Sequence, residues 1–527
     1  TGFNPIMLYS VVTYANMRGV RAVDRIVDLC QRDLAFIWLT KGQKPQRDVF
    51  YDFKGKKLTG EVLDELNYQF MRRLEKEGFL TLKELYIDGT KLEANANRYT
   101  FVWRGSLNYH LAGLLDTIDA LYTKYNAFLL DNGYGPKYGL GDAHMFVIQG
   151  MDKVRKIIEK NRERKLTKHK KIPNNTIIEI DHCSPLEIRK LQKNLMRIAE
   201  GEGIEFVFGK GMRKPEIQKL YEELEKCGKR LMEYKECFKI MGKDRNSYSK
   251  TDLEATFMRM KEDHMLNGQL KPAYNVQIAV ENYFIVHGYI SNDRTDYNTL
   301  IPVLKKHRKA FGDKLEAVTA DSGYCSEKNL LYLKENGIRS FIKLQDHEKR
   351  NTRAYKEDIG KYYNMTYAVF EDEHYYICHD GRELRHIRTE RKEQDGYTQT
   401  VEVYGCADCS ECEYKSKCLY RYNPEKNPDQ NKVMKINERW EELREESNTN
   451  IQSEEGILKR QTRSIQTEGH FGDIKENENF RRFNYRSKEK VYKEFMLYAI
   501  GRNIMKYHRF LHQEIEKFEG KKEQKAA

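Results

Sequence analysis

The sequence contains no long apolar run and no secretion signal. No segment approaches the ~18 consecutive apolar residues that a membrane-spanning helix needs. The first residues, TGFNPIMLYS, lack the basic start and the small-residue cleavage site of a signal peptide. We therefore expect a cytoplasmic protein with no membrane partner. Because the chain opens on Thr1, close to a helical pattern, we also expect that a start codon and some leading residues precede it.

A phosphate-binding loop and an evenly spread set of cysteines are also missing. FGKGM at 208–212 is too short to cradle a phosphate, because nothing resembling G-x-x-x-x-G-K-[ST] surrounds it. Cysteines are few, 10 in 527 residues, and four of them fall between Cys406 and Cys418. In a large basic chain without a signal peptide, this clustering favours metal binding over a disulfide framework.

Negative charge is in deficit. Lysine and arginine number 93 against 80 acidic residues, which gives a formal net charge of +13. This balance predicts a soluble protein with a polyanionic partner. The run at 153–171, KVRKIIEKNRERKLTKHKK, holds ten basic residues against two Glu and is a candidate surface for a phosphate backbone. A solvated helix face would produce the same run.

The length allows about three domains of ~150 residues. Residues 5–78 show helical spacing, and such a bundle could bind DNA, bind a partner subunit or simply pack. The region 104–250 is charged and helical, whereas 345–421 contains short tyrosine-rich strands. We therefore expect an N-terminal helical domain (1–80), a catalytic domain in three parts (81–103, 251–345 and 433–527), a helical insertion (104–250), and a Cys-rich β insertion with its linker (346–432).

The order of elements in the catalytic parts predicts the fold. A strand at 82–97 carries Asp88 at its centre or end, and a hairpin turns around Glu281 and Asn282. Thr295 and Asp296 can cap the helix that follows. The next predicted elements are a strand at 314–321, a helix at 326–335 and a strand at 340–344. This order predicts an α/β fold of the ribonuclease H-like type, a mixed sheet flanked by helices, with both aspartate strands side by side.

Three carboxylates stand out in this frame. Asp321 ends the buried strand in LEAVTADSGY, Asp88 ends the similar run ELYID, and Glu468 lies in the helical segment TEGHFGDIKEN. Open α/β sheets place their chemistry at the carboxyl ends of strands. Because Mg²⁺ prefers a few carboxylates together with water and phosphate oxygens, the three acids suggest a divalent-metal site. Alternatively, Asp321 only caps the following helix.

The clustered cysteines suggest a second metal. Cys406, Cys409, Cys412 and Cys418 follow the spacing C-x2-C-x2-C-x5-C, which brings four thiolates within reach of one ion. A tetrahedral structural zinc is the first interpretation, and an iron–sulfur cluster is the alternative. Cys378 is a reserve ligand, although a lone cysteine in a strand is usually just buried. Four free thiols in a loop would be the interpretation without a metal.

Five blocks of the sequence, in order, resemble bacterial insertion-sequence transposases of the DDE type. They are LYIDGTKLEANAN around Asp88, SYSKTDLEATFMRMKED at 247–263, NGQLKPAYNVQ at 267–277, TADSGY at 319–324 and TEGHFGDIKENENFRRF at 467–483. The insertion-sequence group numbered eleven eighty-two is the most similar. The resemblance implies that Asp88, Asp321 and Glu468 form a catalytic triad that binds two Mg²⁺ or Mn²⁺ ions. It also implies double-stranded DNA as partner, both terminal inverted repeats and target, and a homodimer on that DNA.

The resemblance further implies a Tyr-Arg-Glu-Lys signature around the glutamate. Lys475 meets the lysine position, seven residues after Glu468. The arginine belongs four residues before the glutamate, where this chain has Ser464. Arg463 lies one position farther away and would project differently from an α-helix, so we retain it only as a candidate DNA contact. No tyrosine occupies the position that the signature requires.

The C-terminal segment adds further candidates for DNA binding. From Phe480 onward, basic residues that include Arg481 and Arg482 are interleaved with aromatic residues. Cations can meet phosphates while aromatic rings stack on unpaired bases, so this pattern suits a nucleic-acid surface. The apolar residues of LYAIGRNIMKYHRFL more simply pack against the sheet.

The predicted reaction is metal-dependent phosphoryl transfer, in which DNA is cleaved and its ends are joined to a target. Three other functions fit parts of the sequence. A hydrolytic nuclease of the same fold would cut DNA without joining strands, and a retired transposase would bind DNA without cutting it. A zinc-stabilised scaffold would explain the cysteines but not the acids at the strand ends.

Overall fold

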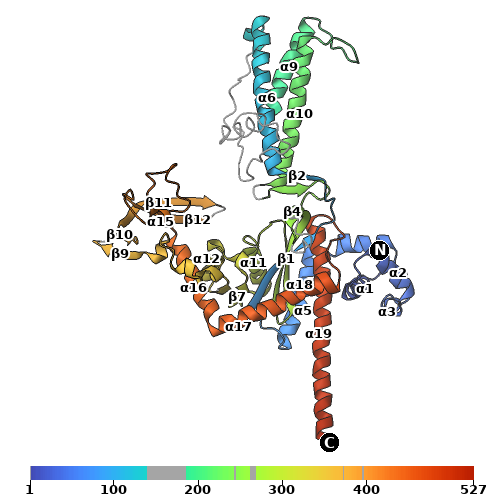
Figure 1. The fold of residues 1–527 in the computed structure, drawn as a ribbon. Helices are drawn as coiled ribbons and strands as arrows, with labels where there is room; N and C mark the ends of the chain where they lie inside the picture. The colour runs from blue at the N-terminus through green and yellow to red at the C-terminus, as the bar shows by residue number, and fades with distance from the viewer. Residues whose placement is uncertain are drawn as a thin grey trace.

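The computed structural model describes residues 2–138, 185–242, 245–260, 269–371, 373–394 and 397–526. The basic run at 153–171 lies outside the described residues. The chain forms a mixed α/β core, a six-stranded mixed sheet flanked by helices, from which a helical rod and a small β-rich unit project (Figure 1). A mixed sheet with helices on it matches the predicted fold class at this level.

Helices occupy the predicted N-terminal segment. Their bounds are α1 (Pro5–Met17), α2 (Val23–Arg32), α3 (Leu34–Leu39), α4 (Arg47–Asp52), a π turn η1 (Phe53–Lys57) and α5 (Gly60–Lys76). Helix α1 begins where it does because the Asn4 side chain accepts the backbone N–H of Ile6 at 2.8 Å, and Pro5 follows as the first helical residue. Apolar residues of α1 share one core with strands β5 and β6 and with the C-terminal helix α19.

The central sheet has the strand order β4-β5-β1-β7-β8, and β6 pairs with β5. The strands are β1 (Glu84–Glu93), β4 (Thr256–Arg259), β5 (Leu270–Glu281), β6 (Phe284–Ser291), β7 (Ala317–Ala320) and β8 (Arg339–Ile342). Strand β1 runs antiparallel to β5 and parallel to β7, so the sheet changes from antiparallel to parallel pairing at β1. The predicted hairpin is confirmed, and its turn residues Asn282 and Tyr283 have positive φ of 44° and 66°.

Helix α11 (Leu300–Phe311) lies between β6 and β7, and helix α12 (Glu327–Glu335) connects the parallel strands β7 and β8. Their apolar faces are buried against the sheet, with Leu304 and Leu330 in the same core as Val318 of β7. The predicted order of strand, hairpin, helix, strand, helix and strand is therefore confirmed. A short 3₁₀ turn, η2 (Ser322–Tyr324), joins β7 to α12.

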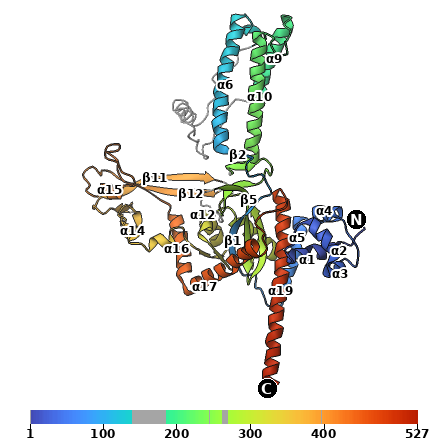
Figure 2. The ribbon, with the colours of Figure 1, turned by 45° about the vertical axis from the view of Figure 1, so that its right-hand side comes forward.

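The helical rod is inserted between β1 and β4 (Figure 2). It consists of α6 (Arg104–Asp131), α7 (Gly135–Tyr138), α9 (Pro185–Gly201) and α10 (Glu216–Met241). The rod has its own apolar core, to which Leu115, Leu195 and Leu224 contribute. A two-stranded ribbon of β2 (Phe101–Trp103) and β3 (Ser247–Ser249) lies at its base. Sequence reasoning did not predict this ribbon.

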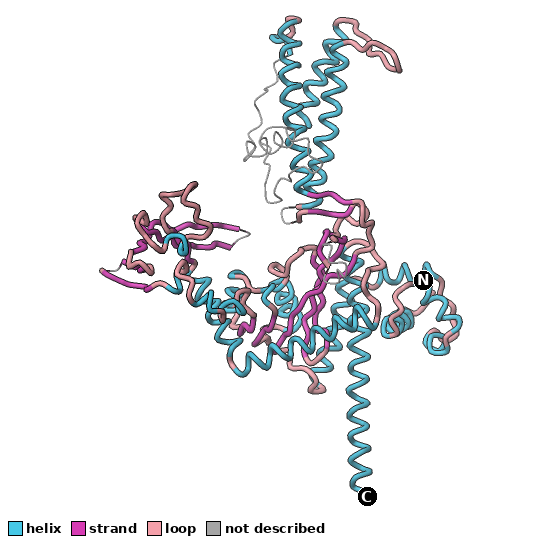
Figure 3. Tube along the Cα trace, viewed as in Figure 1, coloured by secondary structure: helices cyan, strands magenta, loops and turns pink. Residues whose placement is uncertain are grey.

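The β-rich unit is a second sheet, which Figure 3 shows apart from the central one. Its strands follow the order β13-β12-β11-β10-β9, and all pairs are antiparallel. They are β9 (Thr366–Phe370), β10 (Glu373–Ile377), β11 (Glu383–Gln394), β12 (Tyr397–Cys406) and β13 (Val433–Ile436), with α13 (His347–Arg350), α14 (Arg353–Lys356), η3 (Tyr362–Asn364) and α15 (Lys415–Cys418) around them. The predicted tyrosine-rich strands lie in this sheet.

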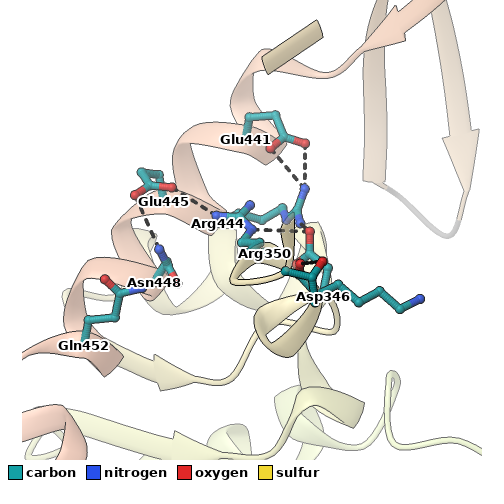
Figure 4. Close-up of polar contacts among 9 residues, drawn as sticks. Asp346, Arg350, Glu441, Arg444, Glu445, Asn448 and Gln452 are labelled. Atoms are coloured by element: carbon teal, nitrogen blue, oxygen red, sulfur yellow. Dashed lines mark hydrogen bonds and ion pairs between the residues drawn. The ribbon is translucent and has the colours of Figure 1, made fainter. Parts of the chain in front are cut away.

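An ion-pair network ties the two ends of this β-rich unit together (Figure 4). Asp346, at its start, accepts hydrogen bonds from Arg444 and Arg350, the latter at 3.3 Å. Arg444, at its end, also binds Glu441 at 2.8 Å, and Arg350 reaches Glu445 at 3.2 Å. Because Arg444 and Asp346 are mostly buried, with 16% and 24% of their side chains exposed, water screens their attraction only in part.

The C-terminal segment returns to the central sheet. Its helices are α16 (Glu438–Gln452), α17 (Glu454–Arg463), the π turn η4 (Ser464–Glu468), α18 (Gly469–Gly472), the π turn η5 (Asp473–Asn477) and α19 (Lys488–Ala526). The first turns of α19 are buried through Phe495 and Tyr498, and its end extends away from the core (Figure 1). Among the described residues, no helix combines the length and apolar character needed to cross a membrane.

Candidate active site

The sheet register brings Asp88 and Asp321 next to each other. The parallel pairing of β1 with β7 ends at Ile87 and Ala320, and each aspartate is the next residue of its chain. Neighbouring strands lie about 4.8 Å apart, so the two backbones are close at this edge. The prediction that the two aspartates stand on adjacent strands is confirmed. Strand β1 continues beyond Asp88 to Glu93, where it pairs with β5 and also forms a parallel bridge with Arg482.

The Asp88 carboxylate is buried between its strand and the C-terminal helices. Its Oδ1 accepts the N–H of Gly89 at 2.8 Å. Its Oδ2 accepts hydrogen bonds from Arg463 Nη1 at 2.9 Å and from Thr467 Oγ1 at 3.2 Å. These contacts join residues that are 375 and 379 positions apart in sequence. They fix the orientation of Asp88 relative to the segment that carries Glu468.

Glu468 lies near Asp88, beside the same arginine. The Arg463 guanidinium that binds Asp88 is also 3.8 Å from Glu468, measured from Nη2 to Oε1. The positively charged side chain of Arg463 therefore bridges the carboxylates of Asp88 and Glu468. The Glu468 side chain is 63% exposed, against 11% for Asp88. The glutamate is thus the member of the pair that solvent, or a large substrate, can reach.

A π turn explains why Arg463 can pair with Glu468. The two residues are five positions apart, and five residues of an α-helix would place them on different faces. However, Ser464–Glu468 forms a π turn, in which backbone bonds connect residues five apart. The side chains at the two ends of this turn therefore share a face. The π turn therefore places Arg463 beside Glu468, whereas an α-helix would separate them, and the role of Arg463 as a DNA contact stays a prediction.

Asp321 lies at the end of β7 and also caps a short turn. It follows β7 directly, beside Asp88, and its side chain also caps the turn η2 by accepting the N–H of Gly323. Capping uses Oδ1. The expectation that Asp321 caps the following helix was wrong, because Ser326 is the N-cap of α12 and Asp321 caps only the short turn between β7 and that helix.

A further carboxylate, Asp296, lies at this edge. Its Oδ1 accepts hydrogen bonds from Asn275 Nδ2 at 2.7 Å and from Gln277 Nε2 at 2.8 Å. The expectation that its side chain caps the following helix was wrong. The residue before α11 is Thr299, and it binds the backbone carbonyl of Asp296 instead. The available signal was the pair of amides at alternate positions of an otherwise apolar strand, Asn275 and Gln277.

Two glycines leave room for the Asp296 carboxylate. A Cβ atom at Gly323 would lie 3.0 Å from Asp321 Oδ1 and 3.1 Å from Asp296 Oδ2. A Cβ atom at Gly89 would lie 2.9 Å from Asp296 Oδ1. Asp296 therefore lies close to the chain one residue after Asp88 and two residues after Asp321.

The buried side chain of Tyr324 lies among these acids. Its hydroxyl donates a hydrogen bond to Gln277 Oε1. Burial, followed by the charges of Asp296, Asp88 and Asp321, raises its pKa well above the ordinary value. The hydroxyl therefore stays protonated and acts as a donor. The three carboxylates therefore all lie near this one buried hydroxyl.

The donor set fits a hard divalent cation in its chemistry. Asp88, Asp321 and Glu468 offer only carboxylate oxygens, the ligands that Mg²⁺ and Mn²⁺ take in proteins. As positioned, no three His, Cys, Asp or Glu side chains of the described ranges form a metal-binding group. At Asp88 the reason is visible, because Arg463 and Thr467 already occupy Oδ2. The three acids therefore fit Mg²⁺ or Mn²⁺ in the chemistry of their oxygens and in the part of the fold where they lie.

The other predicted DNA-binding residues lie close to this site along the chain. Lys475 is buried in the turn η5. Arg481 is half exposed and pairs with Glu476 at 2.6 Å. Arg482 donates to the carbonyl of Ala96 at 3.3 Å, where its segment runs beside the end of β1. Both arginines thus make contacts within the protein, and their binding to DNA stays a prediction.

The cysteine cluster lies at the end of β12. Cys406 and Cys409 are buried, and Cys378 packs against the same apolar cluster. The thiol of Cys406 donates to the carbonyl of Asp408 at 3.2 Å, and burial together with a contact from Cys409 raises its pKa to about 11. All nine cysteines of the described ranges are free of disulfides. The four thiols fit zinc as a donor type, but their grouping around an ion stays a prediction.

Part of the chain is similar to a known protein family. A family model described as a transposase DDE domain matches residues 377–508. No curated protein matches the chain. The matched segment runs from the end of β10 into α19 and contains Arg463, Glu468 and the four clustered cysteines, whereas Asp88 and Asp321 precede it. The match supports a transposase of the DDE type.

Proposed function

We propose that this transposase cleaves DNA at the ends of an insertion sequence and joins those ends to a target, using a ribonuclease H-like catalytic core. The observation that carries the proposal is the Arg463 bridge, which brings Asp88 and Glu468 together although they are 380 positions apart in sequence. Asp321 stands beside Asp88 in the sheet register. Acids from three distant segments thus gather at one edge of the sheet.

In the proposed mechanism, Asp88, Asp321 and Glu468 hold two Mg²⁺ or Mn²⁺ ions. Bound there, the ions would supply charge stabilisation at the phosphate and a lowered pKa for the attacking group. Thr467 holds the Asp88 carboxylate in place, and the neighbouring Arg463 offsets the negative charge of the acids. The exposed Glu468 faces the side from which DNA would approach.

The chemistry requires no covalent protein nucleophile. Water would attack the scissile phosphate in line and break the bond between phosphorus and the 3′ oxygen, leaving a 3′-hydroxyl end. That hydroxyl would then attack a target phosphate, forming one phosphodiester bond while another breaks. Because both steps are displacements at phosphorus, one carboxylate site can serve both.

The remaining assignments belong to the same proposal. The net charge of +13 suits a DNA partner, and Lys475, Arg481 and Arg482 are proposed to contact phosphates. Both transposon ends must be held together, so we propose a homodimer on DNA. We also propose that the chain belongs to the insertion-sequence group numbered eleven eighty-two, and that the cysteine cluster holds a structural zinc.

The test is a cleavage and strand-transfer assay on a fragment that carries the ends of the element. We expect cleavage that needs Mg²⁺ or Mn²⁺ and joins ends to a target plasmid. Asp88→Asn, Asp321→Asn and Glu468→Gln should each abolish cleavage, whereas a gel-shift assay should still show DNA binding. The matched control is Asp313→Asn, an acid with 74% of its side chain exposed near the end of α11.

The two alternatives predict different products in this assay. A hydrolytic nuclease would release cut fragments without any joined plasmid. A retired transposase would shift the fragment in a gel and leave it uncut. Cleavage that persists in any one triad variant would remove that residue from the proposed site.

A further inference from the structure

We propose that Asp296 is a positioning residue of the active site, which acts through Gln277 and Tyr324 to fix the spacing of Asp88 and Asp321. This inference rests on the proposed function, because it assigns Asp296 to the same carboxylate site. The observation behind it is a chain of polar contacts that passes across β1 at Gly89, the residue after Asp88.

The chain of contacts connects elements on opposite sides of β1. Gln277 belongs to β5, which pairs with one edge of β1, and the register places it directly opposite Gly89. Tyr324 follows β7, which pairs with the other edge. The Tyr324 hydroxyl nevertheless donates to Gln277 Oε1, and Gln277 Nε2 donates to Asp296 at 2.8 Å. The Gln277 amide therefore links the segments that flank β1.

Gly89 makes this crossing possible. A Cβ atom at position 89 would lie within 3 Å of Gln277 Nε2 and 2.9 Å from Asp296 Oδ1. Any side chain there would push the amide and the carboxylate away from the strand. Glycine in a strand interior often marks such a close approach of another group. The Gly after Asp88 is thus explained by the contacts of Gln277 and Asp296.

Asp296 is the acceptor on which the chain of contacts ends. Its Oδ1 takes the amide hydrogens of both Asn275 and Gln277, and its Oδ2 faces the backbone at Gly323, next to Asp321. An ionised acceptor makes shorter and stronger hydrogen bonds than a neutral one. With Asp296 in place, the Gln277 amide has one orientation, with its oxygen toward Tyr324. Without it, the Gln277 amide keeps only the Asn275 Oδ1 acceptor, at 3.0 Å, so the amide and the tyrosine are held less firmly.

The consequence concerns the two aspartates. Tyr324 lies three residues after Asp321, and Gly89 directly follows Asp88, so the chain of contacts fixes the backbone beside each acid. Two ions that share a phosphate require carboxylates at a defined spacing. Outer groups that orient metal ligands typically change metal affinity or activity by about 10–100-fold when they are removed. We expect an effect of that size for Asp296.

The experiment compares variants of the full chain. In Asp296→Ala the acceptor is lost, and we expect the single-turnover cleavage rate to fall about 10–100-fold, with Mn²⁺ binding, measured by calorimetry, weakened in the same range. Asp296→Asn keeps an oxygen acceptor, so both values should stay within about tenfold of wild type. Asp313→Asn is the control, and DNA binding in a gel-shift assay should be unchanged throughout.

Two substitutions that exchange the carboxylate and the amide test the contact between Asp296 and Gln277. Gln277→Glu places a carboxylate against Asp296 and should slow cleavage and weaken Mn²⁺ binding. Adding Asp296→Asn restores a donor and an acceptor across the same contact, so the double variant should recover most of both losses. Recovery of this kind would not occur if each residue only contributed to general stability.

Three results would overturn the inference. Asp296→Ala could cleave DNA and bind Mn²⁺ like wild type. Asp296→Asn could be as impaired as Asp296→Ala, which would make Asp296 a direct metal ligand. The double variant could also show no recovery.

Failure of the proposed function would look different. Wild type would then not cleave DNA, although the calorimetric comparison of Mn²⁺ binding would still decide the role of Asp296. A wild-type chain that neither cleaves DNA nor binds Mn²⁺ would overturn both.

Discussion

At the scale of single residues, the site depends on how each carboxylate is held. Asp88 has a strand neighbour on one oxygen and two helix side chains on the other. A carboxylate that accepts several hydrogen bonds keeps one orientation. Arg463 provides charge, whereas Thr467 provides only a hydrogen bond. The two contributions can therefore be separated by substitution.

The Thr467 contact leads to a first prediction. Thr467→Val keeps the shape of the side chain but removes the hydroxyl, so Asp88 loses one donor. A hydrogen bond to a charged group contributes about 1.5–3 kcal/mol, and 1.4 kcal/mol corresponds to tenfold. We expect cleavage to slow at least about tenfold at saturating metal, while Thr467→Ser retains the wild-type rate. Equal rates for Val and Ser would show that the hydroxyl does not matter.

A second prediction concerns Gly89. Gly89→Ala would place a methyl group within 3 Å of Gln277. Overpacking of this kind typically costs about 1–3 kcal/mol. Thermal or urea unfolding should show that loss of stability. In α6, Gly113 has no atom within 4 Å of an added Cβ, so Gly113→Ala should be neutral or stabilising by up to about 1 kcal/mol.

At the scale of elements, the π turn at Ser464–Glu468 sets the face that Arg463 and Glu468 share. A π turn behaves as an α-helix with one extra residue, and such turns are frequent at functional sites. Apart from Glu468 itself, Ile465 is the exposed residue within this turn, at 61%. It is therefore the residue whose removal disturbs packing least.

A third prediction follows from this geometry. Deleting Ile465 places the arginine four residues before the glutamate, the spacing that pairs side chains on an α-helix. We expect this variant to cleave DNA at close to the wild-type rate. Inserting one alanine after Ile465 makes the spacing six, which separates the two side chains, and should abolish cleavage. Loss of cleavage in the deletion variant would contradict this account of the turn.

The ion-pair network at the base of the β-rich unit gives a pH-dependent prediction. Burial would raise the pKa of Asp346, but the contacts with Arg444 and Arg350 outweigh it and lower the pKa below its ordinary value. A depressed folded-state pKa means that the contribution to stability is present above the unfolded value of about 3.9 and is lost as the pH falls through the folded value.

Asp346→Asn should therefore destabilise the protein by about 1–2 kcal/mol at pH 7, and by less as the pH falls below about 4. Urea unfolding at pH 7 and at a pH below about 4 measures this difference in the free energy of unfolding. Glu445→Gln is the matched control, because Glu445 is 65% exposed and its pair with Arg350 is worth little. A loss that is the same at both pH values would show that charge is not the cause.

The elements near the acids could be predicted from sequence to different degrees. The buried strand before Asp321, the hairpin after 270 and their order depend on local patterns, and the structure confirms them. Asp296 was missed because it stands in a loop, where a helix cap explains an aspartate equally well. The π turn was missed because hydrophobic spacing carries no signal for one additional residue. Glu468 could be assigned only through resemblance, because nothing local connects it to β1.

At the scale of the whole molecule, two long insertions interrupt the sequence of the central unit, and the strands of the central sheet still pair with one another. The helical rod departs between β1 and β4, and the β-rich unit departs between β8 and α16 (Figures 1 and 2). Each has its own apolar core. The insertions still contact the central unit at their bases, because the rings of Phe101 and Trp103 pack on Phe257 of β4, and Gln399 of β12 donates to Glu327 of α12 at 3.2 Å.

The most direct test of the central claim is iron-induced cleavage of the protein itself. Fe²⁺ replaces Mg²⁺ at carboxylate sites, and with ascorbate and peroxide it cuts the nearest backbone. We predict cuts near 88, 321 and 468 in the same molecule, all suppressed by excess Mg²⁺. Cuts near the two aspartates without any near Glu468 would contradict the account.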